Sequence, residues 1–324
     1  MKYFATIGPN FNSKEDILEA INLGLTGVRI NLSHGSLDDI SPWLNNIVEA
    51  ENESQKDIEI ILDIVGPEIR VKAKKDYFIK ANEIFEVGSD VLNNKDILVK
   101  DALIRAVEVG DILSFDDGLF ECPVIQKHID YISLEALEDC SLKRNKSVAI
   151  KGKELNLDLF SEVDIHNFYT SKKYNINSFM QPFVRGKDDV IILREKLKSI
   201  GINKTYLYAK IEDESGIKNL EEIIDVCDEV VIARGDLGNN IGLLNVARAQ
   251  KYISSKCRDG KKNFMVVTQL LNSMIDSKIP TRAELNDIYN STLDGASSLM
   301  ITGESAIGKY PIEAIRYLIN GSKI

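Results

Sequence analysis

The segment TYLYAKIEDESGIKNLEEIIDVCDEVVIARGDLG, residues 205–238, decides the fold class. It begins with the apolar run Thr205–Ile211, continues through the amphipathic stretch Gly216–Cys227, and returns to a second apolar run, Glu229–Ala233. Short runs rich in Val, Ile and Leu are typical of strands that are buried on both faces of a parallel sheet. A strand, a helix and a second strand in this order predict an α/β protein.

The same alternation extends along the whole chain. Eight apolar runs are predicted to be strands: Tyr3–Ile7, Gly27–Leu32, Glu59–Ile64, Ile176–Met180, Thr205–Ile211, Glu229–Ala233, Asn263–Thr268 and Ser298–Thr302. Seven amphipathic segments are predicted to be helices: Ser13–Leu23, Leu37–Glu49, Lys187–Ser199, Gly216–Cys227, Leu243–Arg258, Arg282–Asp294 and Pro311–Ile319. This count predicts a (β/α)₈ TIM barrel. A doubly wound sheet would also alternate, but Gly8-Pro9-Asn10 is not the glycine-rich loop that often follows its first strand.

One long interruption separates the third and fourth predicted strands. Between residues 71 and 154 apolar and polar residues alternate, with turn signals such as Asp116-Asp117-Gly118, which predicts short antiparallel strands. We therefore expect a TIM-barrel domain at 1–70 and 155–324, with an inserted, β-barrel-like lid domain at 71–154. The lysines that close this segment fit either a solvated linker or a cationic lid edge that faces phosphates.

The composition of the chain argues against several classes of protein. The 324 residues carry a formal net charge of −10, whereas a protein that binds duplex nucleic acid normally shows a basic excess. The four cysteines have no C-x-x-C spacing, so a disulfide framework or zinc site is not expected. The first ten residues lack the apolar run of a signal peptide, and no stretch approaches a membrane span. A soluble cytoplasmic protein with no nucleic-acid or membrane partner is expected.

Charged residues follow nearly every predicted strand. In a TIM barrel the carboxyl ends of the strands meet at one face, where functional residues lie. The charged residues expected there are Arg29, Asp63, Arg70, Lys210, Glu212, Arg234, Asp236 and Glu304. So many charges crowd together only if they pair internally or bind ions and ligand.

The residue types indicate the chemistry of this face. Glu212 and Asp236 follow adjacent strands and suit a hard cation such as Mg²⁺, although Lys210 could instead form a structural ion pair with either of them. Arg29, Arg70 and Lys210 suit recognition of phosphate or carboxylate groups. Gly235 would let backbone N–H groups approach a ligand closely. Asn31, Ser33 and Asp63 could hold a monovalent ion or hydrogen-bond one another, and His34 is the only histidine in these loops.

At these residues the sequence closely resembles the pyruvate kinase family. The resemblance rests on motifs that occur in the family's order and spacing: Thr6-Ile7-Gly8-Pro9, Arg29-Ile30-Asn31-Leu32-Ser33-His34-Gly35, Gly66-Pro67-Glu68-Ile69-Arg70, Asp116-Asp117-Gly118-Leu119, Lys210-Ile211-Glu212, Ala233-Arg234-Gly235-Asp236-Leu237-Gly238, Thr268-Gln269, Pro280-Thr281-Arg282-Ala283-Glu284, Leu293-Asp294-Gly295-Ala296 and Gly303-Glu304 with Gly308-Lys309-Tyr310-Pro311. They cover the chain from residue 2 to about residue 319.

The resemblance implies the glycolytic transfer of a phosphoryl group from phosphoenolpyruvate to ADP, with Mg²⁺ (or Mn²⁺) and K⁺. The implied roles fall into four groups: catalytic Lys210, Thr268 and Arg29; substrate-binding Ala233, Arg234, Gly235, Asp236 and Thr268; nucleotide-binding Arg29, His34, Arg70 and Lys146; and metal-binding Glu212 and Asp236 for Mg²⁺, with Asn31, Ser33, Asp63 and Ile64 for K⁺. Glu68 matches the K⁺-dependent branch of the family.

Three departures from the family pattern stand out. Val65 replaces a lysine in the loop after the third strand, and Pro182 replaces a serine near the small-substrate pocket. The chain ends soon after the last predicted helix, Pro311–Ile319, so we expect no C-terminal regulatory domain. We also expect a homodimer through barrel helices. Two alternatives remain open at this point: a diverged phosphotransferase acting on a related enol phosphate or acceptor, and a catalytically inactive binding protein.

Overall fold

The computed structural model describes residues 1–91, 95–116, 118–153, 155 and 157–323. These residues divide into two compact units. The barrel unit comprises Met1–Gly66 and Phe160–Ile324, and the β unit comprises Pro67–Leu159. The predicted division lay after residues 70 and 154, whereas the compact units divide after Gly66 and after Leu159.

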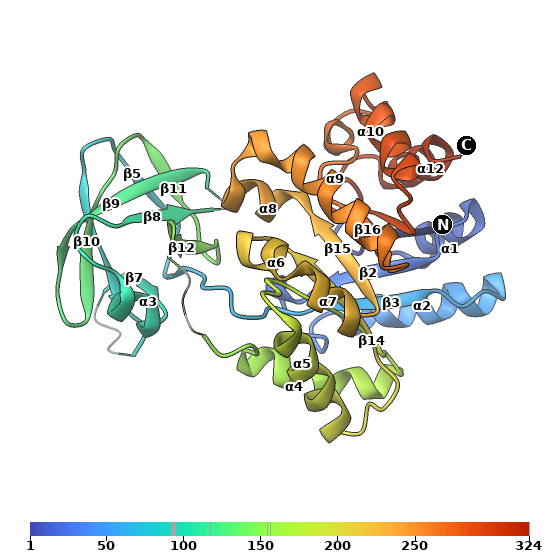
Figure 1. The fold of residues 1–324 in the computed structure, drawn as a ribbon, viewed down its shortest axis with the longest axis horizontal. Helices are drawn as coiled ribbons and strands as arrows, with labels where there is room; N and C mark the ends of the chain where they lie inside the picture. Colours follow the sequence, from blue (N-terminus) through green and yellow to red (C-terminus); the bar gives the residue numbers. More distant parts are fainter. Residues whose placement is uncertain (92–94, 117, 154, 156, 324) are drawn as a thin grey trace. The chain divides into compact units, whose positions relative to one another are not determined.

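Eight parallel strands close into a barrel in the barrel unit, which confirms the predicted fold class (Figure 1). The strands are β1 (Lys2–Thr6), β2 (Gly27–Asn31), β3 (Glu59–Asp63), β13 (Ser178–Gln181), β14 (Tyr206–Ile211), β15 (Glu229–Ala233), β16 (Asn263–Val267) and β17 (Ser298–Ile301). Around the barrel they follow the order β1-β17-β16-β15-β14-β13-β3-β2. All eight correspond to predicted strands, because a run buried on both faces is apolar throughout.

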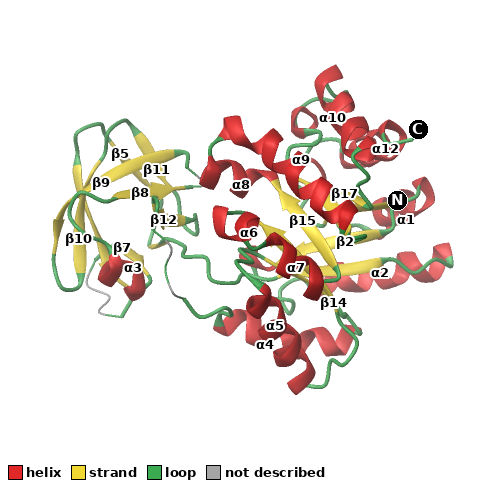
Figure 2. Ribbon diagram, viewed as in Figure 1, coloured by secondary structure: helices red, strands yellow, loops and turns green. Residues whose placement is uncertain are grey.

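Helices surround this barrel (Figure 2). They are α1 (Lys14–Leu23), α2 (Ser41–Ser54), α4 (Glu162–Ser171), α5 (Lys187–Ser199), α6 (Glu214–Lys218), α7 (Leu220–Val226), α8 (Arg234–Ile241), α9 (Leu243–Asp259), α10 (Arg282–Leu293), α11 (Gly303–Ala306) and α12 (Pro311–Gly321), with the 3₁₀ helices η1 (Leu32–His34), η2 (Lys172–Tyr174) and η3 (Asn272–Ile275). Alternate side chains of each strand face either these helices or the barrel interior. The interior holds a buried cluster that includes Phe4, Tyr208 and Met265.

Three helix predictions need correction. The helix expected at 216–227 divides into α6 and α7. The helix expected from Leu37 begins at Ser41, where Pro42 occupies its first turn, because proline has no N–H and suits that position. Helix α4 is absent from the prediction, since it buries polar side chains, including Asp164 and Asn167, in place of an apolar stripe.

The β unit is built from short strands, as its alternating sequence predicts. β12 (Val148–Ile150), β8 (Ile112–Phe115), β9 (Phe120–Lys127), β10 (Tyr131–Glu135), β6 (Ile84–Ser89), β7 (Ile97–Val99) and β4 (Lys72–Ala73) form one sheet in this order. β11 (Cys140–Leu142) pairs with β5 (Tyr77–Ile79), and α3 (Asp101–Ala106) is the helix described in this unit. The unit has its own apolar core, which includes Val87, Leu113 and Leu134.

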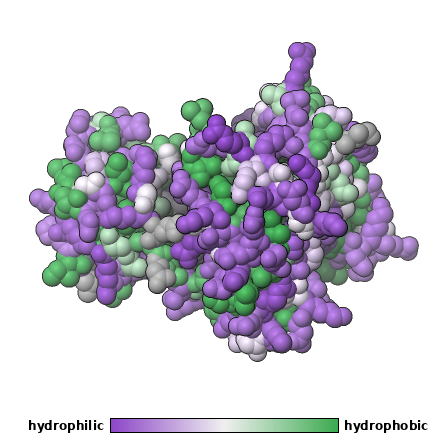
Figure 3. All heavy atoms as spheres, viewed as in Figure 1, coloured by the Kyte–Doolittle hydropathy of each residue, from purple (hydrophilic) through white to green (hydrophobic). Residues whose placement is uncertain are grey.

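The surface agrees with the composition. Hydrophilic side chains dominate the face drawn in Figure 3, with hydrophobic side chains in smaller groups. Among the described residues, no helix combines the length and the apolar character needed to cross a membrane.

Candidate active site

Four charged side chains meet toward the carboxyl ends of β2, β3 and β14. Asp63 Oδ2 accepts hydrogen bonds from Arg29 Nε at 2.8 Å and from Arg29 Nη2 at 2.6 Å. Lys210 Nζ lies 3.3 Å from Asp63 Oδ1 and 3.2 Å from Glu212 Oε1. The side chains of Lys210 and Arg29 are 12% and 13% exposed, and those of Asp63 and Glu212 are 3% and 0% exposed. The structure therefore brings four predicted site residues into one nearly buried network.

Burial and charge act against each other in this network. Burial alone would lower the pKa of the Lys210 ammonium, but the carboxylates of Asp63, Glu212 and Asp236 outweigh it and raise that pKa. Lys210 therefore stays protonated at neutral pH. Burial also raises the pKa of the Glu212 carboxyl to about 8, with Lys210 opposing the shift and Asp236 adding to it. A further cation beside Glu212 would hold it in its ionised form.

Two buried oxygens in this network accept no hydrogen bond. Glu212 Oε1 and Asp63 Oδ1 lie beside Lys210 Nζ, yet neither has a hydrogen-bond partner. Glu212 Oε2 accepts a hydrogen bond from the backbone N–H of Phe183 at 2.8 Å, which fixes the carboxylate. Within the described residues no three His, Cys, Asp or Glu side chains form a ready metal site. Glu212 with Asp236 fits Mg²⁺, because Mg²⁺ usually takes one or two carboxylates and completes its shell with water and substrate phosphate.

Helix α8 begins directly at the end of β15. Its first turn contains Gly235 and Asp236, and Asn240 Nδ2 ties that turn to β14 by donating to the carbonyls of Glu212 at 2.9 Å and Asp236 at 3.0 Å. Thr268 Oγ1, at the end of β16, accepts a hydrogen bond from Gly235 N at 2.9 Å. Its φ of 71° lies in the left-handed region, where a β-branched residue is strained. Such strain concentrates at functional sites.

The predicted K⁺ ligands lie on neighbouring strand ends. Asn31 of β2 and Asp63 of β3 are partners in the strand register, and Ile64 follows Asp63 directly. Asn31 Oδ1 accepts a hydrogen bond from Ser33 N at 3.1 Å. The oxygens of this group are the donor type that a monovalent cation takes, and Asp63 Oδ1, which accepts no hydrogen bond, is consistent with such a ligand.

Comparison with known proteins decides the family. The family model "Pyruvate kinase, barrel domain" matches residues 1–315. The chain is 33% identical over 326 residues to a pyruvate kinase of Bacillus licheniformis, and 34% identical to those of Clostridium perfringens (324 residues) and Thermoplasma acidophilum (318 residues). The chain belongs to the pyruvate kinase family. These alignments cover 97–98% of the chain, but only 56% of the first and third relatives and 67% of the second. The chain thus spans little more than half the length of most of these pyruvate kinases.

Two predicted nucleotide-binding residues belong to the β unit. Arg70 pairs with Glu68 at 2.6 Å and donates to the carbonyl of Asn145 at 2.7 Å. Lys146 pairs with Asp116 at 2.7 Å. Their roles toward a nucleotide stay predictions. His34 is also a predicted nucleotide-binding residue, but its side chain is not among those described. Asp117 of the Asp-Asp-Gly-Leu motif lies outside the described residues as well.

Two further charged residues predicted at this face have partners within the protein. Arg234 donates to the carbonyl of Thr268 from Nε at 3.1 Å and from Nη2 at 2.7 Å, and Nη1 pairs with Asp287 at 2.6 Å. Glu304 is 1% exposed and accepts hydrogen bonds from the backbone N–H groups of Leu271 at 3.1 Å and Thr302 at 2.8 Å. The side chains of both residues therefore hold the loops of the site in place.

Sequence reasoning missed the residues that hold these loops from outside. Asp164 and Asn167 of α4 accept hydrogen bonds from the loops after β3 and β2. One signal was present: Ser161 and Asp164 have the spacing of a capping box, which the structure forms.

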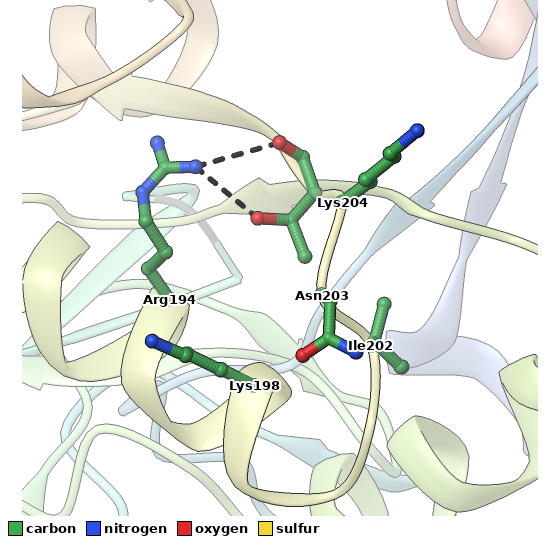
Figure 4. A pocket seen from close by; sticks show the side chains of 6 residues that line it. Arg194, Lys198, Ile202, Asn203 and Lys204 are labelled. Atoms are coloured by element: carbon green, nitrogen blue, oxygen red, sulfur yellow. Dashed lines mark hydrogen bonds between the residues drawn. The ribbon is translucent and has the colours of Figure 1, made fainter.

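A separate cavity of about 480 Å³ has the lining drawn in Figure 4. Its lining includes Arg194, Lys198 and Lys204, at the amino end of β14, whereas Lys210 and Glu212 lie at the carboxyl end. Arg194 is engaged with Thr205 Oγ1 at 3.2 Å and with Asp228 at 2.9 Å. Lys198 is exposed and is therefore a suitable control position for substitutions at the site.

Proposed function

We propose that the chain transfers the phosphoryl group of phosphoenolpyruvate to ADP, giving pyruvate and ATP, with Mg²⁺ and K⁺. One observation carries the proposal: Lys210 Nζ lies between two buried carboxylates, at 3.3 Å from Asp63 and 3.2 Å from Glu212. This arrangement keeps a full positive charge and a divalent-ion ligand side by side. Membership of the pyruvate kinase family supports the same reaction.

Each residue of the network has a role in this reaction. Glu212 and Asp236 would hold Mg²⁺, which when bound neutralises phosphate charge and orients the transferring group. Lys210 would stabilise the charge that spreads over the phosphoryl oxygens as the bond to the enol oxygen breaks and the bond to ADP forms. Arg29 would steady phosphate oxygens. The catalytic contribution of the chain is thus mainly positioning and electrostatics.

The pyruvyl part would occupy the start of α8. The backbone of residues 233–236, where α8 begins, offers N–H groups that suit a carboxylate. Thr268 Oγ1, held beside Gly235, would lie on the path of the proton that reaches the methylene carbon of the enolate and yields pyruvate. Asn31, Ser33, Asp63 and the carbonyl of Ile64 would hold K⁺, which adds positive charge beside the phosphates.

A diverged phosphotransferase is the second candidate, favoured by the packing around Pro182. A Cβ on Gly66 would lie 2.5 Å from Pro182 Cγ, so the proline ring closes over the loop after β3. The family has a serine at this position, and the ring changes the surface beside the small-substrate pocket. A catalytically inactive binding protein is disfavoured by the buried Glu212 and Lys210, which cost stability without a ligand to bind.

A coupled assay for ATP formation tests these candidates. We expect turnover with phosphoenolpyruvate, ADP, Mg²⁺ and K⁺, its loss in Lys210→Met, and its retention in Lys198→Met. Turnover with another phosphorylated acid or acceptor, but none with this pair, would favour the diverged enzyme. Absence of turnover on the whole panel, with no Mg²⁺-dependent binding of phosphoenolpyruvate by calorimetry, would refute the proposed activity.

A further inference from the structure

The first turn of α4 holds the loop that follows β3. Asp164 is fully buried and its carboxylate accepts four hydrogen bonds. Oδ1 accepts from Val65 N at 2.7 Å, and Oδ2 accepts from Gly66 N at 3.0 Å, Ser161 N at 2.9 Å and Ser161 Oγ at 2.8 Å. Three of the four bonds converge on Oδ2, and the fourth fixes Oδ1. Two of them fix the residues that come directly after Asp63 and Ile64.

The same helix face holds the loop that follows β2. Asn167 lies three residues beyond Asp164, so both side chains project from one face of α4. Asn167 is fully buried, and its Oδ1 accepts a hydrogen bond from Leu37 N at 2.9 Å. Asn31 and Ser33 lie a few residues before Leu37. One helix face thus restrains both loops that carry the predicted K⁺ ligands.

These restraints act where the loop has little freedom to adjust. Gly66 has a φ of +65°, and its packing against Pro182 leaves no room for a side chain. Val65 and Gly66 would lose the acceptor for two backbone N–H groups if the Asp164 carboxylate were removed, which is costly for buried donors. The loop would then have to shift, and the Asp63 carboxylate and Ile64 carbonyl would move with it.

We propose that Asp164 and Asn167 are positioning residues for the K⁺ site, setting the spacing between the oxygen ligands on the β2 and β3 loops. The proposal rests on the proposed function, because it takes the K⁺ ligands from there. The hydrogen bonds that Asp164 and Asn167 accept come from the backbone N–H groups of Val65, Gly66 and Leu37 and from Ser161. Each acts through the backbone of the loop that follows a ligand, as residues behind a metal ligand commonly do.

Ion binding can be measured apart from catalysis. The thermal midpoint of the protein is recorded against KCl, with tetramethylammonium chloride as the ionic-strength reference, in MgCl₂ and phosphoenolpyruvate without ADP. A ligand that binds the folded state raises the midpoint, and the concentration dependence gives an apparent K⁺ dissociation constant. We expect Asp164→Asn to weaken K⁺ binding about tenfold or more. Asn167→Ala should shift it in the same direction, while kcat recovers at saturating K⁺ in both variants.

Ser161→Ala is the matched control, because it removes the side-chain cap of α4 but leaves the bonds to Val65 and Gly66. It should lower the thermal midpoint without changing the K⁺ constant. The proposal is overturned if Asp164→Asn and Asn167→Ala behave as Ser161→Ala does, or if the wild-type protein shows no K⁺-specific stabilisation. If Asp164→Asn does not fold, Asn167→Ala alone decides. Wild-type K⁺ binding without turnover of phosphoenolpyruvate would count against the proposed activity and not against the positioning role.

Discussion

Replacing Lys210 by methionine separates charge from packing at the centre of the site. Methionine keeps an unbranched chain of similar length, so the barrel interior stays filled while the ammonium is lost. At about 3.3 Å and an effective dielectric constant of about 20, each of the two ion pairs of Lys210 corresponds to about 5 kcal/mol of Coulomb energy before desolvation. Removing one partner of a buried pair typically costs about 3–5 kcal/mol.

Loss of the Lys210 ammonium should affect Glu212 more than Asp63. Arg29 continues to pair with Asp63 in the variant, whereas no other cation is paired with Glu212 among the described residues. The pKa of Glu212, already raised to about 8 by burial, should rise further. The variant carboxyl should then stay mainly protonated at both pH values, whereas the wild-type carboxyl is protonated at pH 6 and about half ionised at pH 8. We therefore expect the free energy of unfolding to fall by about 3 kcal/mol at pH 8 and by less at pH 6.

Activity and stability are measured together with Lys198→Met as the control. Urea unfolding at pH 6 and pH 8 in EDTA gives the stability, and the coupled assay gives kcat. We expect kcat of Lys210→Met to fall about 10³-fold, the scale of losing one transition-state charge contact. Lys198→Met should match the wild type in both. The reasoning fails if Lys210→Met keeps kcat within tenfold, or if its loss of stability equals that of Lys198→Met at both pH values.

Three further predictions follow from individual contacts. Arg234→Lys should lower the free energy of unfolding by about 1–3 kcal/mol, because a lysine cannot make both bonds to the Thr268 carbonyl; urea titration checks it, and an unchanged midpoint would contradict it. Gly66→Ala should lower the thermal midpoint, since a Cβ would clash with Pro182 at a φ of +65°, and adding Pro182→Ser should restore part of the loss; equal losses in both variants would refute the clash. In EDTA, the free energy of unfolding should decrease as pH rises from 5 to 8, because the pKa of Glu212 is about 8 in the folded protein and 4.5 ordinarily. The decrease should be at most about 1.4 kcal/mol per pH unit. Glu212→Gln should remove this slope, as should saturating Mg²⁺ in the wild type, and a slope that persists in the variant would exclude Glu212 as its source.

The barrel strands could be predicted because each leaves a pattern within its own few residues. A strand of a closed parallel barrel is buried on both faces, and this leaves a continuous apolar run such as Glu229–Ala233, which has the same bounds in sequence and structure. Helix α4 was not predictable from apolar periodicity, since Asp164 and Asn167 occupy positions that a helix normally gives to apolar side chains. The capping-box spacing of Ser161 and Asp164 was the available signal. A sequence pattern fails here because the helix holds loops by hydrogen bonds.

The sequence does not show which charged residues of the site pair within the protein and which are expected to bind a ligand. Crowded charges at the strand ends either pair internally or await a ligand, and both outcomes occur. Arg234 donates hydrogen bonds to the carbonyl of Thr268, and Glu304 accepts them from the backbone of Leu271 and Thr302. Both charged side chains therefore hold loops in place. Glu212 Oε1 and Asp63 Oδ1 are equally buried but have no hydrogen-bond partner. A buried oxygen without a partner is costly unless a cation occupies it for part of the catalytic cycle. Among the carboxylates of this face, the two whose oxygens lie beside Lys210 without a hydrogen bond are therefore the ones expected to bind substrate and metal.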